Sequence, residues 1–122
     1  MVLKTIAYPF GEVKYYEGFI HMKFDEDLDE VKIEHSKKMF KDIEGFYGAE
    51  KYVLISERNL KTSFDADLMK DLNLSKMRGL AVVSEEGVSR REELIKEQSL
   101  FKGSFAYFTN YKAAEEWART FN

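Results

Sequence analysis

Ser63 is the residue whose type and position most directly suggest chemistry. It lies in the stretch "TSFDADLMKDL", where Phe64, Leu68 and Leu72 recur at the four-residue spacing of an amphipathic helix. Thr62 or Ser63 would be the N-cap of this helix, a role that contributes about 1 kcal/mol of stability and is common for such residues. A phosphate added to a hydroxyl at that position would be stabilised by the helix dipole. Ser63 is therefore a candidate both for a helix N-cap and for a phosphorylation site.

Ser56 and Arg58 lie at the end of the apolar run "YVLIS", which we predict to be a buried strand. Ligands of open α/β sheets bind beyond the carboxyl ends of the strands. Ser56 and Arg58 are therefore candidate binding residues, together with Ser63 and Asp65 in the segment that follows. Arg58 would meet an anion there, although a solvated surface charge is the commoner state of an arginine.

Three aspartates, Asp25, Asp27 and Asp29, match the first ligand positions of a calcium-binding loop. The match ends there, because the sixth position is Glu30 instead of glycine and the twelfth is Ser36 instead of glutamate. An acidic cluster that complements the dipole of a following helix is the simpler interpretation. The sequence predicts no calcium site.

The two histidines, His21 and His35, form no spaced metal-binding motif, and the chain has no cysteine. On the apolar face of a predicted helix, His35 is expected to be a buried, hydrogen-bonded imidazole. The sequence contains neither a nucleophile elbow of the GxSxG type nor a glycine-rich phosphate loop. We therefore predict no metal, no cofactor and no catalytic activity.

The composition is that of one domain spanning residues 1–122. The 19 basic and 22 acidic residues give a net charge of -3 and are interleaved along the chain, so no basic stripe for nucleic acid is expected. The N-terminus has neither the pattern of a signal peptide nor an apolar run long enough to cross a membrane. We expect no stable membrane insertion, and the absence of cysteine fits a cytoplasmic protein.

The N-terminal part predicts a hairpin followed by a helix. Residues 12–24 have the alternation and aromatic content of two strands that meet at Gly18, and residues 2–8 would add an edge strand. The helix after the acidic run would have Asp27 as its N-cap and would end before Gly45.

The second half of the chain alternates strands with helices. The predicted strands are residues 52–56, 79–84 and 104–108, and the predicted helices are residues 62–72, one that begins at Ser89 and one capped by Thr109 or Asn110. Alternation of this kind implies parallel pairing with right-handed crossovers. The sequence thus predicts an α/β fold with a mixed, mainly parallel sheet, an N-terminal antiparallel hairpin and about four helices.

The stretch "SFAYFTNYKAAEEWARTF" is dense in aromatic residues, and we interpret it as packing. Its first part is the last predicted strand, whose side chains alternate between the two faces of the sheet. The spacing i, i+4, i+8 predicts an inward helix face made of Ala113, Trp117 and Phe121.

Over roughly residues 12–121 the chain resembles the STAS domains, specifically the SpoIIAA-like proteins of bacteria. The resemblance rests on the opening hairpin and helix, "VKYYEGFIHMKFDEDLDEVKIEHSKKMF", on "KYVLISERNLKTSFDADLMKDL", and on the closing "SFAYFTNYKAAEEWARTF". It implies the SpoIIAA-like (STAS) fold, an α/β sandwich with a mixed sheet. In regulatory STAS proteins a kinase phosphorylates a serine before the second helix, which would make Ser63 the phosphoacceptor.

The resemblance implies a non-catalytic regulatory or ligand-sensing module whose protein partner or small ligand is unknown. One alternative is a phosphorylation-controlled antagonist of an anti-sigma factor, acting through Ser63. Another is a protein that binds a small apolar or lipid-like ligand in a cavity beside Phe64, Leu68, Phe105 and Trp117. The edge of the N-terminal hairpin also offers a pairing surface for a homodimer.

Overall fold

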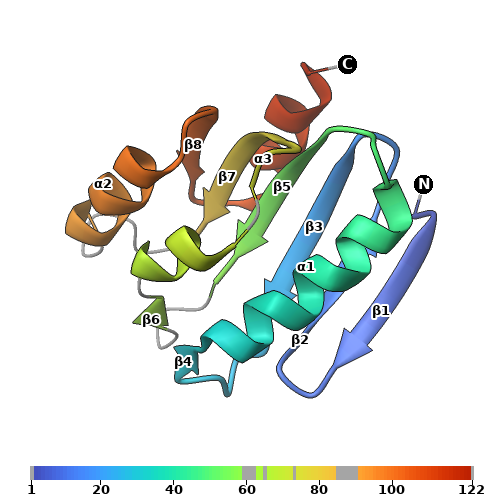
Figure 1. The fold of residues 1–122 in the computed structure, drawn as a ribbon. Coiled ribbons are helices and arrows are strands. Elements are labelled where there is room, and N and C mark those ends of the chain that lie inside the picture. Colours follow the sequence, from blue (N-terminus) through green and yellow to red (C-terminus); the bar gives the residue numbers. More distant parts are fainter. Residues whose placement is uncertain (1, 59–62, 65, 73, 85–90, 122) are drawn as a thin grey trace.

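The computed structural model describes residues 2–58, 63–64, 66–72, 74–84 and 91–121. In these residues a six-stranded sheet has the order β1-β2-β3-β5-β7-β8, with bounds Lys4–Tyr8, Gly11–Tyr15, Phe19–Phe24, Tyr52–Glu57, Met77–Val83 and Ser104–Phe108 (Figure 1). The remaining elements are the short paired strands β4 (Glu30–Val31) and β6 (Ser63–Phe64), the helices α1 (Ile33–Tyr47), α2 (Arg91–Leu100) and α3 (Tyr111–Arg119), and the 3₁₀ helix η1 (Ala66–Asp71).

The sheet is antiparallel at its N-terminal end and parallel in the rest, as the sequence predicts. Strands β1, β2 and β3 pair as antiparallel neighbours, whereas β3, β5, β7 and β8 are parallel. Gly18 lies between β2 and β3 with a φ of 84°, which glycine adopts without steric cost. The central strands are apolar on both faces because α1, η1 and α2 cover one face and α3 covers the other (Figure 1).

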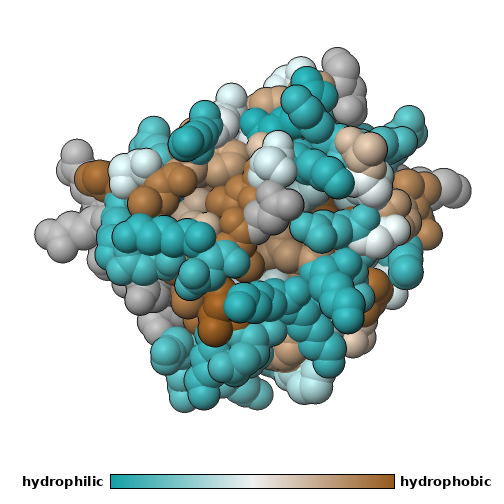
Figure 2. Space-filling model, viewed as in Figure 1, coloured by the Kyte–Doolittle hydropathy of each residue, from teal (hydrophilic) through white to brown (hydrophobic). Residues whose placement is uncertain are grey.

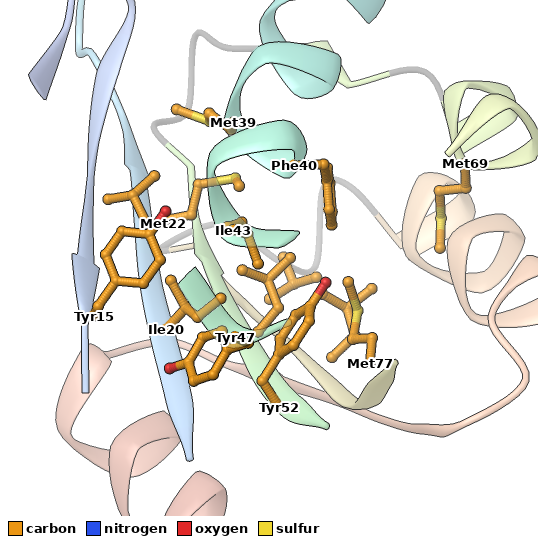
Figure 3. Packing of buried hydrophobic residues seen from close by; sticks show 14 of the residues in the cluster. Tyr15, Ile20, Met22, Met39, Phe40, Ile43, Tyr47, Tyr52, Met69 and Met77 are labelled. Carbon is orange, nitrogen blue, oxygen red and sulfur yellow. The ribbon is translucent and has the colours of Figure 1, made fainter. Parts of the chain in front are cut away.

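The larger core lies between α1 and the sheet. Met39 and Ile43 are fully buried and share one face of α1 because they are four residues apart. They pack in one cluster with Tyr15 of β2 (Figure 3). The hydroxyl of Tyr47, in the last turn, donates toward the carbonyl oxygens of Tyr16 at 2.6 Å and Phe19 at 3.0 Å. These contacts hold the end of α1 against the turn between β2 and β3.

Helix α1 begins and ends later than predicted. Asp27 is not its N-cap, because the chain first forms β4, in which Val31 pairs with Phe64 of β6. Gly45 lies inside the helix, which ends at Gly48 with a φ of 59°. The capping pattern was outweighed by the strand pairing at one end and by the packing of the last turn at the other.

The predicted helix over residues 62–72 is also wrong in its first part. Ser63 belongs to β6 and pairs with Glu30, so it is not a helix N-cap. This pairing leaves a 3₁₀ helix of 6 residues, which is longer than the usual run of about three or four residues in that conformation. The described residues therefore hold three α-helices instead of about four. Two further predicted caps, Thr62 and Ser89, lie outside the described residues.

The inward face of α3 is shifted by one residue from the prediction. Ala114 and Ala118 are buried, whereas Trp117 is only partly buried. The two alanines bring α3 close to the sheet, and the rings of Trp117 and Phe121 occupy the space beside Gly79 of β7. The aromatic density of this segment is packing, as expected.

Gly79→Ala should destabilise the protein, whereas Gly45→Ala should stabilise it. A Cβ on Gly79 would lie 3.0 Å from atoms of both Trp117 and Phe121, and overpacking of this kind costs about 1–3 kcal/mol. A Cβ on Gly45 would meet nothing within 4 Å, and alanine is favoured over glycine inside a helix by about 0.5–1 kcal/mol. Urea unfolding followed by circular dichroism measures both changes. A stabilising Gly79→Ala would contradict the packing of α3.

Candidate functional site

A pocket opens where the four parallel strands end. Lys23, Glu57, Val83 and Phe108 are register partners across β3, β5, β7 and β8, so these positions meet at one edge of the sheet. The pocket has a volume of about 360 Å³ and is lined by Lys23, Phe24, Glu26, Glu57, Arg58, Val83, Ser84, Thr109, Asn110 and Tyr111. Open α/β sheets bind ligands at this edge. We term it the carboxyl-edge pocket.

Glu57 is a fixed carboxylate on the α3 side of the pocket. Nε2 of His21 donates a hydrogen bond of 2.7 Å to Oε1 of Glu57, and Nζ of Lys23 lies 3.9 Å from Oε2. The bond from His21 lowers the pKa of Glu57 below its usual value of 4.5, although burial acts in the opposite direction. The ring of Tyr111 stacks on His21 with 4.1 Å between centroids. Glu57 therefore presents a charged acceptor at neutral pH.

Arg58 is buried in an ion pair at the base of the pocket. Its Nη1 and Nη2 donate to Oε1 and Oε2 of Glu97 at 2.8 and 2.7 Å, and its Nε donates to Oγ of Ser56 at 3.2 Å. The side chains of Arg58 and Glu97 are 6% and 1% exposed. The structure thus brings together two predicted site residues, Ser56 and Arg58. It also shows that Arg58 is not a solvated surface charge, because Glu97 of α2 neutralises it inside the protein.

Ser84 is buried at the pocket with a hydroxyl that has no hydrogen-bond partner in the described part of the chain. Ser84 as a whole is only 3% exposed to solvent. The backbone around it is satisfied, since its N–H donates to the carbonyl of Phe108 at 3.1 Å and its carbonyl accepts from the hydroxyl of Tyr107. Leaving a buried hydroxyl unpaired costs about 1–3 kcal/mol. Ser84 lies at the pocket, and its unpaired hydroxyl lowers the stability of the fold. For these two reasons it is the residue that says most about what the pocket could bind.

The N-terminus of α3 completes the pocket. Asn110, one of the two predicted caps, is its N-cap, and its Oδ1 accepts a hydrogen bond of 2.9 Å from the N–H of Ala113. The N–H groups of Tyr111 and Lys112 precede the intrahelical bonds of α3, so they carry the partial positive charge of the helix end. The pocket therefore presents donors from α3 and Lys23 and an acceptor from Glu57.

The apolar cavity that the described residues enclose beside α1 is much smaller than this pocket. A cavity of about 30 Å³ lies between the sheet and α1, η1 and α2, and Met22, Met69 and Met77 contribute to its wall. This volume is close to that of one water molecule. Phe105 packs with the α1 core and Trp117 with the α3 core, on opposite faces of the sheet, so these two residues do not line one apolar cavity.

For two of the predicted site residues, a role in the site stays a prediction. Ser63 lies in β6, whereas its side chain and the whole of Asp65 lie outside the described residues. The residues that sequence reasoning missed are Glu57, Ser84 and Glu97. Glu57 and Ser84 follow or end predicted strands, so the rule for carboxyl ends of parallel strands would have found them. No sequence pattern marked Glu97.

Two further properties concern the described residues alone. Among them, no group of three or more histidine, aspartate or glutamate side chains is arranged to hold a metal ion. None of their helices combines the length and apolarity that a membrane crossing requires.

Breaking the Arg58–Glu97 pair from one side should be costly, whereas replacing both partners should not. Glu97→Ala removes the carboxylate that accepts from both Nη atoms of the buried Arg58, for which a loss of about 3–5 kcal/mol in unfolding free energy is expected. The double variant Arg58→Met with Glu97→Leu removes both charges and should recover most of that loss. Urea unfolding of both variants gives the two values. Equal destabilisation in the single and double variants would argue against a coupled pair.

Glu57→Gln should remove part of the acid sensitivity of the fold. Because the folded protein holds the pKa of Glu57 below 4.5, this carboxylate contributes stability above that pH and loses it as the pH falls through the folded value. The stability difference between wild type and Glu57→Gln should therefore shrink as the pH falls from about 6 to about 3. Unfolding curves across this range measure it, with Glu116→Gln on the exposed side of α3 as the control. A difference that does not change with pH would contradict the His21–Glu57 bond.

Comparisons with known proteins leave the resemblance to STAS domains a prediction. The sequence matches no protein-family model, and no curated protein is similar to it.

Proposed function

We propose that this chain is a non-catalytic, STAS-like ligand-sensing module that binds a small zwitterionic molecule in the carboxyl-edge pocket. The observation that carries the proposal is the hydroxyl of Ser84, which is buried at the pocket without a partner among the described residues. A buried group that lowers stability is retained most readily where a ligand satisfies it.

The size and position of the pocket support a small ligand. Its volume of about 360 Å³ falls at the lower end of the range for small-molecule sites. It lies at the carboxyl ends of parallel strands, where loops and helix N-termini supply polar groups to ligands. The interior cavity of about 30 Å³ supports this choice over an apolar or lipid-like ligand.

The charges around the pocket support a ligand with both an anionic and a cationic group. Lys23 and the N-terminus of α3 favour an anion, and Glu26 and Glu57 favour an ammonium group. An amino acid or a molecule of that type carries both groups within a few bonds. A pure anion would meet two carboxylates, and a pure cation would meet the helix end.

Binding is favoured over catalysis by the way that the titratable groups are held. His21 is stacked under Tyr111 and bonded to Glu57, and Arg58 is bonded to Glu97. These contacts position the wall of the pocket and leave hydrogen-bonding groups, not an activated nucleophile, facing the ligand. As an edge strand of the sheet, β1 is also compatible with the expected homodimer.

Ser84→Ala should stabilise the free protein and weaken ligand binding. The substitution removes the unpaired hydroxyl, which should raise the unfolding free energy by up to about 1–3 kcal/mol. It also removes a hydrogen bond to the ligand, so the Kd should rise about tenfold. Thermal shift with the common L-amino acids identifies the best zwitterion, and calorimetry measures its Kd. Inorganic phosphate and myo-inositol, which lack the ammonium group, are the comparison probes and should bind more weakly.

Tyr15→Phe is the matched control. The hydroxyl of Tyr15 is also buried without a partner among the described residues, but Tyr15 packs in the α1 core and does not line the pocket. This variant should gain stability and keep the Kd of wild type. The proposal fails if no amino acid binds, or if Ser84→Ala and Tyr15→Phe bind equally well.

A further inference from the structure

A second hollow lies at the opposite edge of the sheet, where β5, β7 and β8 begin. Its volume is about 700 Å³, and its walls come from η1, the end of α2 and the segments that precede these three strands. We term it the amino-edge groove. It shares no lining residue with the carboxyl-edge pocket, so it is a separate surface.

The floor of the groove is apolar and partly open to solvent. Leu72, Leu74 and Leu100 line it and are half-buried. Beneath them Met69 and Met77 are buried and connect the floor to the α1 core. Figure 2 shows hydrophobic side chains gathered over the region between α2 and α1, with hydrophilic side chains around them. Leucines left half-open beside a packed core are a favourable contact for an apolar side chain of a partner.

The rim of the groove is basic. Lys51, Lys70 and Lys102 line it from three different segments and are exposed, and no acidic residue occurs among the described residues that line it. Nζ of Lys70 forms an ion pair with Oδ1 of Asp67 at 3.3 Å. The chain as a whole carries a net charge of -3, so this local excess of positive charge runs against the composition. Such a rim favours a partner with carboxylates.

The arrangement fits a peptide better than an alkyl anion. An alkyl chain binds where about 70–90% or more of its surface is enclosed, whereas Leu72, Leu74 and Leu100 are half-buried and leave the floor of the groove partly open to solvent. The lysines stand on separate segments and would each meet a carboxylate spaced along an extended chain. One large apolar side chain between those carboxylates would contact the leucines.

We propose that the amino-edge groove is a docking surface for an acidic segment of a partner protein that carries a large apolar side chain. The apolar residue lies on Leu72, Leu74 and Leu100, and the flanking carboxylates pair with Lys51 and Lys102. Docking at this edge leaves the carboxyl-edge pocket open, so partner and ligand bind at the same time.

The test is calorimetry of the full chain with the peptide acetyl-Asp-Glu-Leu-Phe-Asp-Glu-amide. Lys51→Glu with Lys102→Glu should weaken binding by about tenfold or more, because two attractive charges become repulsive. The control, Lys37→Glu with Lys41→Glu on the exposed side of α1, makes the same change in net charge and should leave the Kd unchanged. Replacing Leu-Phe of the peptide by Ser-Ser should also weaken binding. Circular dichroism verifies that both double variants are folded.

Three results would overturn the proposal. One is no heat of binding for the peptide with wild type. The second is equal weakening in the two double variants, which would show a nonspecific charge effect. The third is binding of sodium dodecanoate that is tighter than that of the peptide and is lost in Lys51→Glu with Lys102→Glu, which would assign the groove to alkyl anions.

Discussion

The buried ion pair between Arg58 and Glu97 is the interaction on which the arrangement of both edges depends. Two charges removed from water are stabilised only by close geometry, which the two parallel bonds and the contact to Ser56 supply. Helix α2 is also held by Leu94 and Leu100, which pack against the α1 core, whereas its Ile95 is 56% exposed. The pair adds a buried polar contact that joins α2 to the end of β5, and α2 in turn packs against η1. Because Arg58 also lines the carboxyl-edge pocket, the same pair forms the base of the proposed ligand site.

The two edges of the parallel sheet present different chemistry for reasons that follow from strand direction. At the carboxyl edge β5 ends in Glu57, Ser84 follows β7 and α3 begins, so a carboxylate, a hydroxyl and the N–H groups of a helix end line one small volume. At the amino edge, helices end and strands begin, so apolar side chains of the core reach the surface beside lysines that precede the strands. A small polar ligand suits the first edge, and an extended acidic chain suits the second. A sensing module needs two such separate surfaces, one for its signal and one for its partner.

Much of the fold could be predicted from the sequence because its signals are local. Apolar runs such as "YVLIS", the glycine at Gly18 and the cap at Asn110 each act within a few residues, and each prediction is confirmed. The wrong or missing predictions concern contacts between residues that are distant in sequence. Strand β4 pairs with β6 across more than thirty residues, which displaced the start of α1 and put Ser63 in a strand. The ion pair of Arg58 joins residues that are 39 positions apart, and nothing near Glu97 marks it. The resemblance to STAS domains and the role of Ser63 stay predictions.

The central claim is that the carboxyl-edge pocket binds a small zwitterion, and chemical-shift mapping tests it most directly. Uniformly ¹⁵N-labelled protein is titrated with the amino acid that gives the largest thermal shift. The account predicts that the largest amide shifts lie at Ser84, Asn110 and Tyr111, with saturation at one Kd. Shifts confined to the opposite edge of the sheet, or none at these residues for any amino acid, would contradict it.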